Sequence, residues 1–183
     1  MEFSKLLIRE HDDIRRALNI LGRVTDQIQQ AGSIDVHNVN ALLLFLQYYA
    51  ERCHHTKEES IVFPAIRRAL KDQQSDSTLD LKKLTAEHRE QCDLIAKMQI
   101  ALFSGDPAYF ARQAGQLTQL MSEHLLKEEL MVFPVIEELL PEPQTVALAV
   151  QIREANVIFG DCQITLLMEM LKKLERAFPL KAA

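Results

Sequence analysis

Apolar residues recur every three or four positions along most of this chain, and runs that alternate apolar with polar residues are missing. The patterned stretches are rich in Leu, Ala, Gln, Glu, Lys and Arg, which favour helix. Breakers and capping residues cluster at 30–33, 72–77, 104–107 and 141–143, which predicts helices at 3–30, 35–70, 77–103 and 107–139. Short connections between long helices favour an all-α fold, an antiparallel up-down-up-down four-helix bundle.

A further helical pattern covers residues 145–178, where Gly160 and Asp161 predict a break or a bend. Its apolar residues form a stripe that another surface has to cover. The sequence leaves two occupants open: the bundle of the same chain, or a second copy in a homodimer. We therefore expect a bundle over residues 1–140 and a C-terminal helical extension over residues 144–180. The stripe consists of Val146, Ala149, Ile152, Ile158, Leu166, Leu167, Met170, Leu171 and Leu174.

Composition narrows the class of protein. A chain of 183 residues suits one domain, and 21 basic against 26 acidic residues, interleaved along the chain, give a net charge of −5. This balance disfavours a nucleic-acid partner. Three widely spaced cysteines do not form a disulfide framework, and no apolar run is long enough to cross a membrane or to act as a signal peptide. We expect a cytoplasmic protein without a membrane partner.

The chain contains an internal repeat. Residues 54–64 and 124–134 share the pattern H-x-x-K-E-E-x-x-V-F-P at an offset of 70, with seven of eleven positions identical. An earlier helical stretch in each half carries a Glu-His pair, at Glu10-His11 and at Glu87-His88. Each half is therefore a helix with one His followed by a helix with H-x-x-x-E.

Residues four apart lie on the same face of an α-helix, so the His and Glu of each H-x-x-x-E motif project side by side. When the four helices close, four imidazoles and two carboxylates can meet in the core. Imidazole and carboxylate are suited to iron, and a carboxylate can bridge two ions. We predict two iron ions with an oxo or hydroxo bridge and an open position for a small ligand; Mn or Zn could replace iron. The predicted metal ligands are His11, His54, Glu58, His88, His124 and Glu128.

The other repeated residues have simpler interpretations. The Lys and the second Glu of each K-E-E fit a solvated charged face of the helix: Lys57, Glu59, Lys127 and Glu129. Each proline removes a backbone donor, so a kink or a helix end is expected at Pro64 and Pro134. The preceding phenylalanines, Phe63 and Phe133, are expected to fill the dry core beside the site.

On these residues the sequence resembles the hemerythrin-like, or HHE cation-binding, family over about residues 1–140. The resemblance implies an antiparallel four-helix bundle with a non-haem di-iron centre that binds or reacts with dioxygen or nitric oxide. A ferritin-like centre would instead need E-x-x-H motifs on two helices, and only Glu51 and His54 provide one.

Two departures matter. Oxygen-carrying hemerythrins have a fifth His one turn after the third-helix His, where this chain has Cys92, and an H-x-x-x-x-D motif on the fourth helix. Here Glu128 follows His124 by four residues. The set of four His and two Glu resembles a bacterial branch that includes proteins for repair of iron centres under nitrosative or oxidative stress. This counts against reversible oxygen carriage.

Four residues near the motifs remain to be assigned. Cys92 is interpreted as a small apolar core residue rather than a thiolate ligand. His55 is turned about 100° from its neighbour on an α-helix, so we expect it behind the ligands or on the surface. His37 is expected to face solvent, and Glu51 is an additional carboxylate whose counterpart in the second half is Met121.

Three functions follow from this reading. The leading one is a protein that binds, senses, scavenges or stores dioxygen or nitric oxide, rather than an enzyme. The alternative is a stress-response enzyme or iron-centre repair protein that reduces peroxide or nitric oxide or donates iron. A third hypothesis is an interaction module in which the metal is a structural staple and the C-terminal helix is the partner surface.

Overall fold

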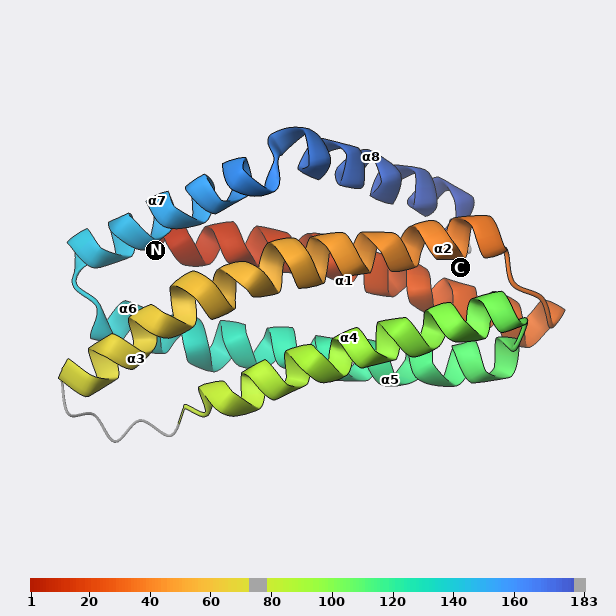
Figure 1. Ribbon diagram of the computed structural model, residues 1–183, viewed down its shortest axis with the longest axis horizontal. Helices are drawn as coiled ribbons and strands as arrows, with labels where there is room; N and C mark the ends of the chain where they lie inside the picture. The colour runs from red at the N-terminus through yellow and green to blue at the C-terminus, as the bar shows by residue number, and fades with distance from the viewer. Residues whose placement is uncertain (73–78, 180–183) are drawn as a thin grey trace.

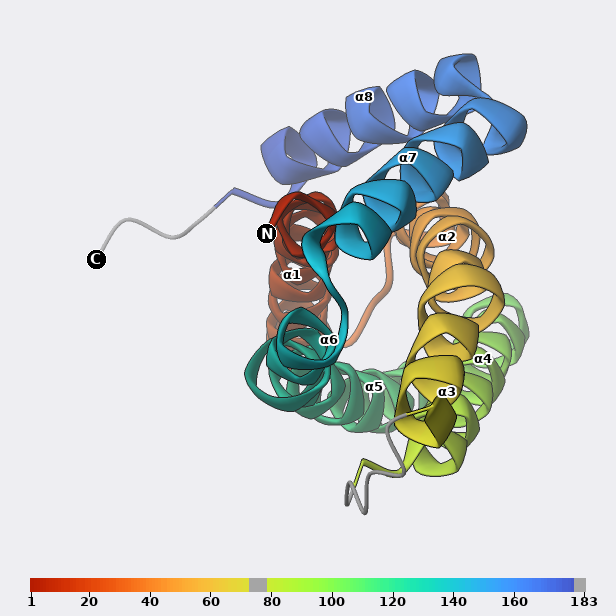
Figure 2. The same cartoon turned by 90° about the vertical axis from the view of Figure 1, so that its left-hand side faces the viewer.

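The computed structural model describes residues 1–72 and 79–179, and the protein is helical throughout these ranges apart from short connections (Figure 1). The prediction of an all-α bundle is confirmed. Successive long helices run in alternate directions in Figure 1, and the view along the bundle in Figure 2 shows them around a common interior. In chain order the elements are α1 (Glu2–Ala31), α2 (Val36–Phe45), η1 (Leu46–His55), η2 (Glu58–Val62), α3 (Phe63–Asp72), α4 (Leu81–Ser104), α5 (Pro107–Lys127), η3 (Glu128–Val132), α6 (Phe133–Leu139), α7 (Glu142–Phe159) and α8 (Asp161–Ala177).

The breaks between helices follow the capping residues of the sequence. Gly32 and Gly105 end α1 and α4 with φ values of 66° and 68°, a left-handed conformation that glycine adopts without strain. Asp35 and Asp106 begin the next helices by accepting backbone N–H bonds with their side chains. Most of the loop predicted at 72–77, and the predicted start of the third helix at residue 77, lie outside the described residues; α4 begins at Leu81.

The second and fourth long helices contain π-helical stretches. η1 and η2 lie within the second helix, and η3 lies within the fourth. Pro64 and Pro134 lie two positions after the last residues of η2 and η3, and the helix continues past each of them. In a π-helix each N–H bonds to the carbonyl five residues back, as Phe63 does to Glu58 and Phe133 to Glu128. The alternative of a helix end at the prolines is therefore wrong, and the alternative of a kink stays a prediction.

The core consists of two apolar clusters with a polar layer between them. On α1, Leu7 belongs to one cluster and Ile14 to the other, and His11 lies between them in sequence. On α4, Leu84 and Leu94 are divided between the same two clusters, on either side of the next predicted His ligand. This arrangement encloses the polar layer in apolar surroundings and limits the access of water.

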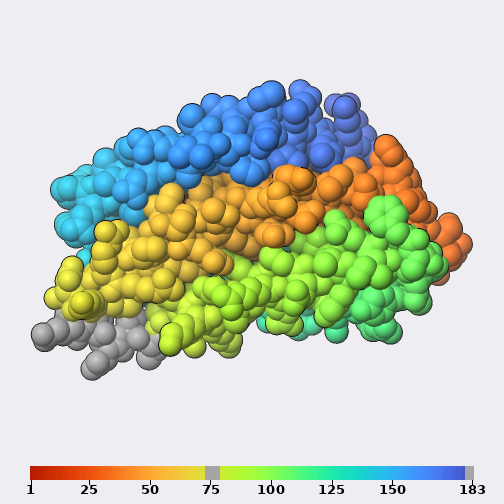
Figure 3. Space-filling view, viewed as in Figure 1, coloured from red at the N-terminus to blue at the C-terminus, as the bar shows by residue number. Residues whose placement is uncertain are grey.

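The C-terminal extension lies along its own bundle. The buried apolar residues of α7 join the cluster that contains Leu7, and those of α8 join the cluster that contains Ile14. Gly160, with φ of 111°, separates the two helices as predicted. Figures 2 and 3 show α7 and α8 on the outside of the bundle, next to α1 and α2. Val157 and Ile158 remain exposed, and a homodimer through this outer face stays a prediction. Within the described ranges no helix has the length and apolar character needed to cross a bilayer.

Candidate metal centre

The structure brings all six predicted ligands together in the polar layer between the apolar clusters. All six side chains are buried. Their possible donor atoms form two overlapping groups, each within 4.8 Å: His11 and His54 with both glutamates, and His88 and His124 with the same two glutamates. Glu58 and Glu128 are therefore common to both groups. This is the arrangement in which two carboxylates can connect two cations.

The two carboxylates turn different oxygens toward the two pairs of imidazoles. Glu58 has Oε1 at 3.4 Å from Nε2 of His54 and Oε2 at 3.5 Å from Nε2 of His88. Glu128 has Oε2 at 3.4 Å from Nε2 of His11 and Oε1 at 3.2 Å from Nε2 of His124. All four Nε2 atoms thus face the carboxylates.

Each of these imidazoles has a second carboxylate on its other nitrogen. Nδ1 lies 2.7 to 2.9 Å from a carboxylate oxygen in all four cases, and since a carboxylate only accepts, Nδ1 carries the hydrogen. Nε2 of a neutral imidazole then has a bare lone pair directed at the centre, as a metal ligand requires. The pairs are His11 with Glu129, His54 with Glu10, His88 with Glu59, and His124 with Glu87.

These contacts correct the interpretation of the K-E-E residues as a solvated charged face for Lys57, which is buried, whereas Glu59 is exposed and Lys127 and Glu129 are half-buried. Lys57 is only 2% exposed, and its ammonium donates to Glu10 and to Asn156 of α7. Lys127 donates to Glu87 at 2.6 Å. The second Glu of each motif pairs with the His of the other half. The sequence carried a signal for this, since the repeat conserves K-E-E between its halves and each half has Glu directly before its first His.

The phenylalanines of the repeat lie where the sequence predicts them. Phe63 stacks on His88 with ring centroids 5.9 Å apart, and Phe133 stacks on His11 at 5.5 Å. Both rings are buried in the apolar cluster beside the centre. They cover the imidazoles and exclude water, which strengthens electrostatic interactions there.

The chemistry of the buried atoms fits a pair of metal ions. Both oxygens of Glu58 and of Glu128 are buried without a hydrogen-bond partner in the described ranges, as are Nε2 of His11 and of His54. Nε2 of His88 and Nε2 of His124 lie 2.8 Å apart. Two bare lone pairs at that distance would repel unless a proton or a metal ion lies between them. Without one, orphaned acceptors of this kind each cost about 1–3 kcal/mol.

The pKa values of these groups indicate the same demand for positive charge. Burial opposes protonation of His11, but the carboxylates of Glu128, Glu129 and Glu58 raise its pKa to about 11. His124 is likewise opposed by burial, and Glu128 raises its pKa to about 9. Despite burial, the neighbouring imidazoles hold the pKa of Glu58 well below its ordinary value. Protons thus occupy the imidazoles of His11 and His124 in the metal-free chain, and a metal ion can displace them.

Two buried residues near the centre were missed or misjudged from the sequence. His55 is buried with both ring nitrogens unpartnered within the described part of the chain, so the expected surface alternative is wrong. Gln91, three residues beyond His88 on α4, is fully buried with neither amide atom hydrogen-bonded to a described residue. No feature of the sequence alone distinguishes Gln91 from a surface glutamine.

A hollow at the surface reaches the His55 and His88 side of the centre. Cys92 and Glu51 line it together with those two histidines. Burial, followed by the charge of Glu51, raises the pKa of the Cys92 thiol to about 12, so this thiol stays protonated at neutral pH. Cys92 is half-buried at this hollow, so the expected core position is wrong, and its exclusion from the ligand set stays a prediction. His37 is exposed, as predicted.

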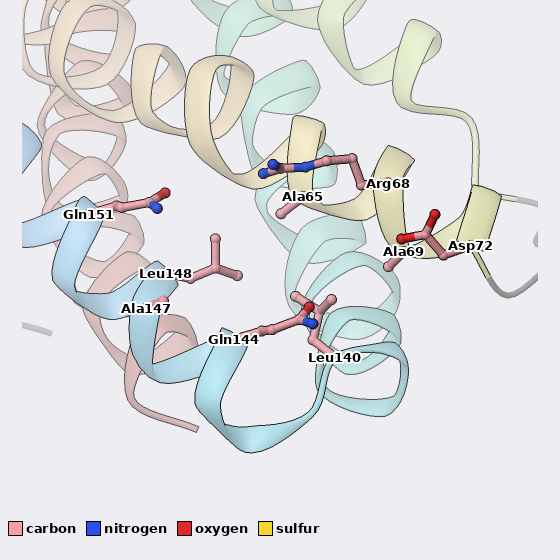
Figure 4. Close-up of a pocket in the computed structure, with 9 residues that line it drawn as sticks. All are labelled: Ala65, Arg68, Ala69, Asp72, Leu140, Gln144, Ala147, Leu148 and Gln151. Atoms are coloured by element: carbon pink, nitrogen blue, oxygen red, sulfur yellow. The ribbon is translucent and has the colours of Figure 1, made fainter.

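A second hollow, of about 320 Å³, lies at the end of the bundle between α3 and α7 (Figure 4). Its lining includes Arg68, Asp72 and Gln151 but none of the six predicted ligands. It is therefore separate from the centre described above.

Comparison with known proteins gives one match. The model of the Hemerythrin HHE cation binding domain matches residues 3–145 of this chain. No curated protein and no solved structure gives a significant match. The matched range contains the four long helices and all six residues of the centre, and it ends at the beginning of α7.

Proposed function

The chain belongs to the hemerythrin HHE cation-binding family, and from this premise we propose a non-haem di-iron protein that binds or senses dioxygen or nitric oxide at an open iron position. The proposed ligands are His11, His54, Glu58, His88, His124 and Glu128, with an oxo or hydroxo group as a further bridge.

One observation carries this proposal: buried acceptor atoms on three of the four long helices converge at one point and have no hydrogen-bond donor among the described residues. The two carboxylates would bridge the ions because each has one oxygen near either pair of imidazoles. Imidazole and carboxylate donors are typical of iron sites, although Mn or Zn ions accept the same donors.

The surrounding residues have a positioning role. The carboxylates on Nδ1 fix the tautomer and the orientation of each imidazole and make Nε2 a stronger donor. Lys57, Lys127 and Arg15 partly neutralise these carboxylates. The centre nevertheless has six carboxylates against three lysine and arginine side chains, and protons on the imidazoles, or metal ions that displace them, balance the remaining negative charge.

When bound, iron supplies the electrons and the open coordination position for the gas. The protein contributes fixed donors and a dry interior, since apolar clusters lie on both sides of the centre.

The test is the absorption spectrum of the anaerobic, reduced, iron-loaded protein before and after exposure to each gas. A new band with dioxygen or with nitric oxide, absent from the metal-free protein, is the expected result. An unchanged spectrum with both gases would contradict the proposal. Stoichiometric binding without turnover, in the presence of an added reductant, would separate this function from that of a peroxide- or nitric oxide-reducing enzyme.

A further inference from the structure

His55 lies inside the protein although neither the repeat nor the proposed ligand set accounts for it. It follows His54 within the first H-x-x-x-E motif, and its residue is 4% exposed. Neither ring nitrogen has a hydrogen-bond partner within the described residues. Buried polar side-chain atoms generally have partners, so an imidazole with two free nitrogens indicates a missing one.

The position of the ring points to one half of the centre. His55 stacks face to face on His88, with centroids 3.9 Å apart and an angle of 10° between the rings. It meets His124 edge-on at 5.9 Å. One nitrogen from each of these three histidines can be chosen so that all lie within 4.8 Å of one another. His11 and His54 form no such group with His55.

Two consecutive residues face inward at this point in both halves of the repeat. His54 and His55 end the π-helical stretch η1 and are both buried. In the second half His124 and Leu125 lie in the α-helix α5 and are both fully buried. The inward position is therefore common to both halves, and only the imidazole is particular to the first half.

We propose that His55 is a third imidazole ligand of the metal ion held by His88 and His124. This inference rests on the proposed function. Ligation requires the His55 ring to turn out of its stack on His88, so that the in-plane lone pair of one neutral ring nitrogen points at the ion. The hydrogen stays on the other nitrogen and no bond breaks. That ion would then have five protein donors and the ion of His11 and His54 would have four.

The internal repeat supplies a conservative replacement. The residue equivalent to His55 in the second half is Leu125, which is fully buried. A leucine at this point of the motif is therefore compatible with the fold, and packing alone does not require a histidine. Cys92 supplies a rescue position, because it lies one turn beyond His88 and lines the same hollow as His55.

The experiment is an anaerobic titration of metal-free full-length protein with Fe(II), followed by Mössbauer spectra of the iron-57-loaded proteins. Wild type is expected to bind two ions and to give two unequal iron signals. His55→Leu should weaken one of the two ions at least about tenfold and make the remaining signals more alike. Adding Cys92→His to His55→Leu should restore tighter binding of the second ion. His37→Leu, at an exposed histidine, is the matched control and should behave as wild type.

Two results would overturn the inference, and they are distinguishable. If wild type binds two ions but His55→Leu has the same affinities and the same spectrum, His55 is not a ligand and the proposed function survives. If wild type itself binds no pair of ions, the proposed function fails and the inference fails with it. The wild-type spectrum also tests the inference without any variant, since two equivalent iron ions would contradict it.

Discussion

The two lysines of the repeat provide a sharp test of the network around the centre. Lys57 is 2% exposed and contacts Glu10, Asn156 and Cys53. Lys127 makes the corresponding ion pair with Glu87, but its side chain is 34% exposed. Replacing either lysine by methionine keeps most of the apolar stem and removes the charge. The same chemical change is thus made once in the interior and once near the surface.

The expected losses of folding free energy differ because water can replace the ammonium group of Lys127 near the surface but not that of Lys57 in the interior. Lys57→Met leaves Glu10 as a buried carboxylate without its cation, and breaking a buried pair in this way costs about 3–5 kcal/mol. Lys127→Met removes a pair that lines a hollow at the surface, where water can solvate the carboxylate of Glu87, and this costs about 0–1 kcal/mol. For a chain of this size these free energies correspond to a fall in Tm of about 6–20 °C and of less than about 4 °C, respectively.

The assay is urea and thermal unfolding of both variants and wild type, metal-free, at pH 7. Lys57→Met should be the less stable variant by at least about 2 kcal/mol. Burial raises the pKa of Glu10, but His54 and Lys57 lower it by more, so the pKa of Glu10 lies below its ordinary value. Losing Lys57 therefore raises the pKa of Glu10. The penalty should therefore shrink on acidification, as Glu10 becomes protonated. Equal stability of the two variants at pH 7 would refute the reasoning.

Three further predictions concern other parts of the molecule. Cys92→Ser should leave the metal content and the absorption spectrum unchanged, and a changed spectrum would indicate thiolate ligation. Metal binding at pH 7 should release protons, because His11 and His124 have raised pKa values of about 11 and about 9. The same raised pKa values stabilise the metal-free fold, fully so below the ordinary pKa of His. This stabilisation is lost as the pH rises through 9 to 11. Calorimetry in two buffers of different ionisation enthalpy checks the release, and an enthalpy independent of buffer would contradict it. Arg16→Met should loosen α8, detected as faster hydrogen exchange in that helix, because Arg16 holds Glu175 through two bonds of 2.8 and 2.9 Å. Since Arg16 lowers the pKa of Glu175, the difference from wild type should disappear as pH falls through that lowered pKa, and a difference that persists in acid would count against this pair.

The sequence predicted the helices and the six residues of the centre because both follow from local patterns. Glycine and aspartate mark the ends of α1 and α4, and the repeated H-x-x-x-E motif needs only helical periodicity to place its side chains on one face. The duplication added the information that two such faces meet.

The network around the centre depends on contacts that no single helix contains. Glu129 pairs with His11 across 118 residues, and Asn156 reaches Lys57 from α7, so helical periodicity could not assign them. His55 was misjudged for a different reason: a turn of 100° from a ligand does not bring a residue to the surface where packing covers that face of the helix as well, as it also covers Leu125 in the second half. The apolar stripe predicted that α7 and α8 are covered but not by which surface, because the same residues could pack on their own bundle or on a second copy.

The central claim is that six side chains hold two metal ions at one buried point. Elemental analysis of the full chain, loaded anaerobically with Fe(II) and freed of unbound metal, tests it most directly when wild type is compared with the double variant Glu58→Ala, Glu128→Ala. The account predicts two iron ions per wild-type chain and a loss of both from the variant. Equal iron content in the two proteins would contradict it.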